Sequence, residues 1–75
     1  MNQPEIGKLI RELRLETGLT QEKFAAALGI AYPTVSRWEN NRAQPSPMAL
    51  KLIEKMLLRL GDRGKELIAK HFPKD

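Results

Sequence analysis

The chain has 75 residues, of which 41% are hydrophobic, and a formal net charge of +4, so it is long enough for one small domain. It contains no cysteine and a single histidine, which excludes a disulfide framework and any metal site built from cysteines or several histidines, and we expect no cofactor. No apolar run approaches the roughly 20 residues of a membrane span, and the start lacks the layout of a signal peptide, so we expect a soluble, cytoplasmic protein.

The basic charge is concentrated in the last third of the chain. Residues 1–31 carry equal numbers of basic and acidic side chains, whereas residues 46–75 carry seven basic and four acidic ones. A basic protein can bind a polyanion, but residues 32–45, the most suggestive segment for binding, hold only a small part of the excess. The charge alone therefore does not identify a partner.

The first helix signal is Pro4, which fits the first turn of a helix because its missing N–H needs no partner there. Gly18 favours the left-handed turn that ends a helix. Between them, apolar residues at three-to-four spacing predict one inward-facing stripe, formed by Ile6, Leu9, Ile10 and Leu13.

A second helix is predicted over about residues 21–28. Thr20 is a good N-cap, and Glu22 suits the positive end of the helix dipole. Gly29 ends the helix after two turns. The residues expected to face inward are Phe24, Ala25 and Leu28.

The third predicted helix covers about residues 33–40. Pro33 fits its first position, and Tyr32 is expected to be its N-cap or the last loop residue, held extended by the proline that follows it. At about 100° per residue, Val35 and Trp38 fall on one side of this helix. We therefore expect the tryptophan in the core and not as a stacking platform for bases.

Glu39 falls on the same inward side of the third helix. A buried carboxylate is costly unless it is paired and hydrogen-bonded. Arg14 lies beside the apolar stripe of the first helix. We therefore predict an ion pair between Arg14 and Glu39 that links the two helices.

Two further helices are predicted in the last third. Ser46 and Pro47 form an N-cap followed by a first-turn proline, and this fourth helix runs to about Leu60. The fifth covers about residues 63–72. Its apolar side consists of Leu67, Ile68 and Phe72. Five short helices with short loops, and almost no strand pattern, predict a compact all-α domain.

Residues 20–41, TQEKFAAALGIAYPTVSRWENN, resemble the signature of the lambda-repressor/Cro-like (Xre) helix-turn-helix family. The agreement extends over a dozen spaced positions, and the family's domain would account for about residues 4–60. The resemblance implies a five-helix lambda-repressor-like fold with a central helix-turn-helix at about 21–28 and 33–40. Residues 1–75 would then form a single DNA-binding domain.

The resemblance also implies a role for each matching position. Base edges would be read by Tyr32, Pro33, Ser36 and Arg37. The DNA backbone would be contacted by Gln21, Thr34, Asn40, Arg42 and Gln44. Arg14 and Glu39 occupy positions that form an interhelical ion pair in some family members, in agreement with the pairing predicted from burial.

Two positions depart from the family pattern. Position 33 is usually polar, whereas Pro33 can make only an apolar contact, for instance with a thymine methyl group. Asn41 replaces the usual glycine, and asparagine tolerates the left-handed conformation, so we expect the turn to survive. The departures bear on which bases are read.

These features predict a transcriptional regulator, a repressor that binds double-stranded DNA at a palindromic operator. We expect a homodimer through the C-terminal helices, where the apolar residues that could form the contact are Leu57, Leu58, Leu60, Leu67, Ile68 and Phe72. The alternative is an antitoxin-type module that binds a toxin partner and represses its own operon. No acid–base pair, nucleophile or metal constellation points to an enzyme, and we expect no carboxylate around His71.

Overall fold

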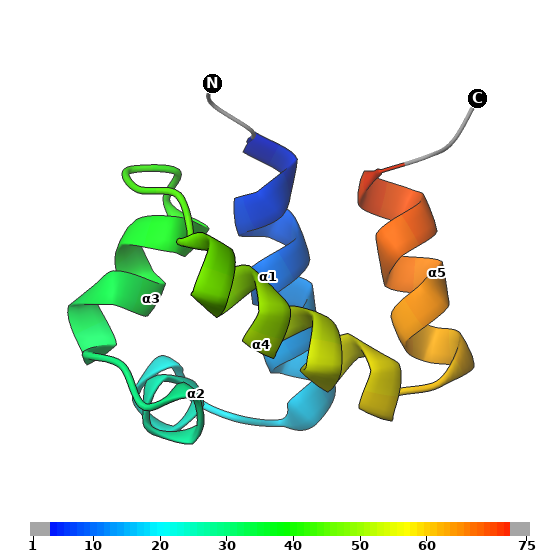
Figure 1. The fold of residues 1–75 in the computed structure, drawn as a ribbon, viewed down its shortest axis with the longest axis horizontal. Helices are drawn as coiled ribbons and strands as arrows, with labels where there is room; N and C mark the ends of the chain where they lie inside the picture. Colours follow the sequence, from blue (N-terminus) through cyan, green and yellow to red (C-terminus); the bar gives the residue numbers. More distant parts are fainter. Residues whose placement is uncertain (1–3, 73–75) are drawn as a thin grey trace.

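The computed structural model describes residues 4–72, which form five helices and no strand. The helices are α1 (Pro4–Thr17), α2 (Gln21–Leu28), α3 (Tyr32–Glu39), α4 (Pro47–Arg59) and α5 (Asp62–His71). Helix α1 runs through the middle, α3 and α5 pack on opposite sides of it, and α4 crosses between them (Figure 1). The predicted all-α architecture is confirmed. None of the helices within residues 4–72 is long and apolar enough to cross a membrane.

The core is built from the inward side of every helix. The predicted stripe of α1 is fully confirmed, since all four of its residues are buried. Phe24 and Ala25 of α2 join it, and Val35 and Trp38 come from α3. The remaining buried apolar residues lie on α4 and α5 and are Ala49, Ile53, Leu57 and Leu67. This shared core fixes how the short helix α3 sits on α1.

The helix ends follow the predicted capping residues. The hydroxyl of Thr20 accepts a hydrogen bond from the backbone N–H of Lys23, 3.2 Å away, at the start of α2. Ser46 caps α4 in the same way, through the N–H of Ala49 at 3.2 Å. Asn41 adopts the left-handed conformation with φ of 58°, which confirms the prediction that asparagine keeps the left-handed turn after α3.

The predicted start of α3 was wrong by one residue. Ala31 is the N-cap, with extended backbone, and Tyr32 is already helical. Pro33 is then the second helical residue, where the backbone N–H also needs no intrahelical partner. The shift places the tyrosine ring on the exposed first turn of α3, beside the proline.

Candidate nucleic-acid interface

The outward side of α3 and the loop after it form a surface hollow of about 210 Å³. We call this the α3 hollow, and the residues that line it are Tyr32, Pro33, Ser36, Arg37, Asn40 and Arg42. It contains all four residues predicted to read bases and two of those predicted to contact the DNA backbone. The structure thus brings six predicted residues together on one surface.

The opposite side of α3 is buried against α1. Val35 is fully buried and Trp38 is 4% exposed, so the tryptophan belongs to the core, as expected. Helix α1 approaches the C-terminal end of α3 closely at Gly7. A Cβ atom at this position would clash with the carbonyl oxygen of Trp38 and lie 2.6 Å from Oδ1 of Asn41. Only glycine allows this approach, which sets the position of α3.

Arg14 and Glu39 form the ion pair that the sequence predicts, and the pair is bidentate. Nε of Arg14 lies 2.7 Å from Oε2 of Glu39, and Nη2 donates to Oε1 at 3.1 Å. The third donor, Nη1, binds the carbonyl oxygen of Leu19 at 3.1 Å. The side chains are 13% and 5% exposed, and the carboxylate raises the pKa of Arg14 above its usual range. The pair therefore joins α1, the turn before α2, and α3.

Gln21 is attached to the same pair. Its Nε2 donates a hydrogen bond to Oε1 of Glu39 at 3.1 Å. The first residue of α2 and the last residue of α3 are therefore connected through side chains. Sequence reasoning paired Glu39 with Arg14 but missed this third partner.

The polar side chains that line the α3 hollow differ in whether they already form hydrogen bonds within the protein. Nδ2 of Asn40 donates to the carbonyl oxygen of Ser36 at 2.9 Å and lies 3.4 Å from its hydroxyl oxygen, so it caps its own helix. Within residues 4–72, Arg37 and Arg42 form no ion pair or side-chain hydrogen bond, and both are exposed. Two arginine side chains are thus available to a partner in the hollow.

The remaining predicted backbone-contact residues lie outside the α3 hollow. Thr34 is half-buried in α3, and Gln44 is exposed in the loop that leads to α4. Neither lines the hollow. Within the described residues, no group of histidine, aspartate or glutamate side chains is placed to hold a metal ion.

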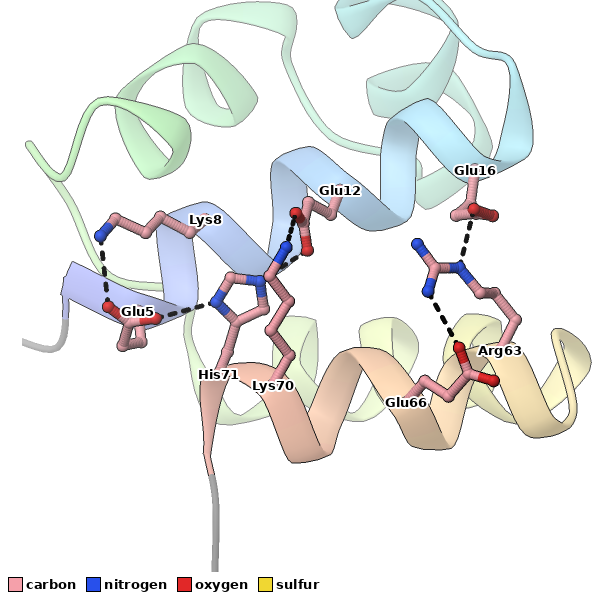
Figure 2. Close-up of polar contacts among 8 residues, drawn as sticks. All are labelled: Glu5, Lys8, Glu12, Glu16, Arg63, Glu66, Lys70 and His71. Carbon is pink, nitrogen blue, oxygen red and sulfur yellow. Dashed lines mark hydrogen bonds and ion pairs between the residues drawn. The ribbon is translucent and has the colours of Figure 1, made fainter.

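A second polar cluster joins α1 to α5, and sequence reasoning missed it (Figure 2). Nδ1 of His71 lies 2.8 Å from Glu5, and Nε2 lies 2.7 Å from Glu12. Lys70 also reaches Glu12, at 2.6 Å, and lowers the pKa of that carboxyl to about 2, with His71 contributing. We call this cluster, together with Lys8, Glu16, Arg63 and Glu66, the α1–α5 seam.

The expectation that no carboxylate surrounds His71 was therefore wrong. Glu5 and Glu12 are seven residues apart, so both fall on the side of α1 that faces α5. The sequence does contain a matching spacing of acidic residues on α1 and basic residues on α5. This spacing can be interpreted only once the two helices are known to be neighbours.

Comparison with known proteins finds a matching family and several curated relatives. A family model described as "Helix-turn-helix" matches residues 10–57. The "Uncharacterized HTH-type transcriptional regulator YiaG" of Escherichia coli strain K12 is 43% identical over 44 residues, which are 59% of this chain and 46% of the relative. The proteins of that name from strains O6:H1 and O157:H7 match equally. The chain thus spans about half the length of these curated relatives, and no solved structure matches it.

Proposed function

The chain belongs to the helix-turn-helix family, as the resemblance to lambda-repressor/Cro-like proteins predicts, and on this basis we propose that it binds a specific double-stranded DNA sequence as a cytoplasmic repressor of transcription. The observation that carries the proposal is the α3 hollow, where six residues predicted to contact DNA lie together, two of them arginines that are available to a partner. Such a function needs neither a catalytic group nor a cofactor.

Helix α3 would enter the major groove with the α3 hollow facing the bases. Arg37 would bind the O6 and N7 atoms of a guanine, while Tyr32 and Pro33 would contact a thymine methyl group. Ser36 would complete the base-reading set. The register would be fixed on phosphates by Gln21, Thr34, Asn40, Arg42 and Gln44.

A palindromic operator calls for two copies of the chain, with half-sites about 34 Å apart. Of the apolar residues predicted for that contact, Leu57 and Leu67 are excluded, because they are 3% and 0% exposed and belong to the core. Ile68 is 40% exposed and lines an apolar hollow on α5 with Phe72. We infer a homodimer centred on these two residues, and sedimentation as a monomer at tens of micromolar would count against it.

The antitoxin-type alternative would use the same α5 face for a different protein. Copurification of a stoichiometric partner from the source cells would favour it over the homodimer. No side chain of the α3 hollow distinguishes the two proposals, since both include DNA binding.

Selection from random duplex DNA tests the proposal. The wild type should enrich one sequence, and Arg37→Ala should relax the preference at one base position by roughly 1–3 kcal/mol. Lys51→Ala is the matched control, since it removes an exposed cation on α4 and should leave every base preference unchanged. Replacing the selected thymines by deoxyuridine, which lacks the methyl group, should weaken binding at the position read by Pro33. If the wild type enriches no sequence, the proposed function is wrong.

A further inference from the structure

The connection between Gln21 and Glu39 links the proposed DNA-backbone contact to the buried ion pair. Oε1 of Glu39 accepts two hydrogen bonds, from Nε2 of Gln21 at 3.1 Å and from Nη2 of Arg14 at 3.1 Å. Gln21 is half-buried at the start of α2. Its side chain therefore lies where α2, α3 and the solvent meet.

The chemistry of the partners fixes the orientation of the glutamine amide. An ionised carboxylate can only accept a hydrogen bond, so the NH₂ group of Gln21, and not its carbonyl oxygen, must face Glu39. That group has two hydrogens, and Glu39 takes one of them. The second N–H remains available as a donor, which is the group that a phosphate oxygen requires.

Glu39 itself cannot rotate away, because Arg14 holds both of its oxygens, at 2.7 and 3.1 Å. Arg14 is held in turn by the carbonyl oxygen of Leu19 at 3.1 Å. A free glutamine side chain would lose considerable rotamer freedom on binding. In this network the freedom of Gln21 is already restricted before any ligand arrives, which favours binding.

We propose that Glu39, held by Arg14, is a positioning residue that orients the Gln21 amide toward a DNA phosphate. The inference rests on the proposed function, because it assigns a role to a contact that exists only if the chain binds DNA. The buried ion pair then has a second task besides holding α3 on α1. The ion pair strengthens the contact of Gln21 with the DNA backbone without itself touching DNA.

The double variant R14M/E39M separates the two tasks. Replacing a buried ion pair by apolar side chains of similar size is often neutral for stability, so the fold should be kept while Gln21 loses its anchor. In the wild type, Gln21→Ala should weaken DNA binding roughly tenfold, the cost of one hydrogen bond to a charged group. R14M/E39M alone should weaken binding several-fold, and adding Gln21→Ala to it should cost only about twofold more.

The base preference is the readout that distinguishes positioning from a displaced recognition helix. R14M/E39M should bind every sequence more weakly in the same proportion and keep the wild-type preference. A changed preference would mean that α3 has moved, and would overturn the inference. Wild-type affinity in R14M/E39M, or an undiminished tenfold effect of Gln21→Ala in that background, would overturn it as well.

A measurement on the free protein keeps the inference testable if R14M/E39M does not fold. The side-chain NH₂ group of Gln21 in the wild type should be as rigid as ordered backbone, with an NMR order parameter of about 0.85. A value below about 0.6 would overturn the inference, since the amide would then not be held. Failure of the wild type to select any DNA sequence would instead overturn the proposed function, whatever the order parameter.

Discussion

Helix α1 is joined to α3 by one buried ion pair and to α5 by a row of contacts whose carboxylates are partly exposed. The Arg14–Glu39 side chains are 13% and 5% exposed, whereas in the α1–α5 seam Lys70 and Glu12 are 60% and 30% exposed. A buried pair is costly to break, because its removal strands a charge away from water, while exposed pairs each contribute little. We infer that the α3 side fixes a geometry, whereas the exposed pairs of the α5 side add small, solvent-dependent contributions around the buried ring of His71.

Breaking the buried pair on one side should have the largest effect on stability. Arg14→Ala leaves the Glu39 carboxylate buried without its partner and should lower the free energy of unfolding by about 3 kcal/mol. Urea denaturation measures the change. A loss under roughly 0.5 kcal/mol, the level of ordinary surface substitutions, would contradict the role given to this pair.

Close helix packing offers a matched pair of variants, one at the contact of α1 with α3 and one at the contact of α4 with α5. A Cβ on Gly7 would clash with α3, and a Cβ on Gly64 would clash with the carbonyl oxygen of Leu57, between α5 and α4. Each change to alanine should cost on the order of 2 kcal/mol, as overpacking does. Gly7→Ala should also weaken DNA binding, measured under conditions where both variants are folded, whereas Gly64→Ala should not. Equal DNA affinities would mean that the approach of α1 does not position α3.

Acid should weaken the α1–α5 seam. The folded-state pKa of Glu12 is lowered from 4.5 to about 2, by Lys70 first and then by His71, and His71 also lowers the pKa of Glu5. A lowered pKa means stability that is present above pH 4.5 and is lost as the pH falls towards 2. Wild type should lose more stability over this interval than Glu12→Gln, as urea melts at several pH values would record. Parallel curves for the two proteins would refute this contribution.

Salt should have the smallest effect, and only on the exposed side. Arg63 bridges Glu16 and Glu66 at 2.9 and 3.1 Å, with 48% of its side chain exposed. Arg63→Ala should change the melting temperature no more than an ordinary surface substitution. The difference from wild type should disappear at 1 M salt, where the Debye length is about 3 Å. A difference that persists at 1 M salt would show that the side chain acts through packing.

The contrast between the two sides also explains what could be predicted from the sequence. Glu39 stands out because it falls on the inward side of a short helix, where a charge demands a partner. Pro4, Thr20 and Ser46 are equally local signals, since each acts within one turn of the chain. For these features, the periodicity and capping rules were sufficient.

The α1–α5 seam has no such local signal. Glu12 lies on the exposed part of an amphipathic helix, where a charge is ordinarily solvated, and its partners lie more than 50 residues later in the chain. His71 becomes interpretable only when α5 is known to pack on α1. The hydrogen bond from Gln21 to Glu39 was missed for a related reason, because it depends on the angle between α2 and α3, which the two residue types do not reveal.

The most direct test of the account is to map the DNA-contacting surface by NMR with a selected duplex. Backbone amide signals of Gln21, Ser36, Arg37 and Arg42 should shift on titration with DNA, since they belong to the proposed interface. Signals of Glu12 and His71, in the α1–α5 seam, should stay in place. Shifts confined to α5 and the seam, with the α3 hollow unaffected, would contradict the proposal that α3 reads DNA.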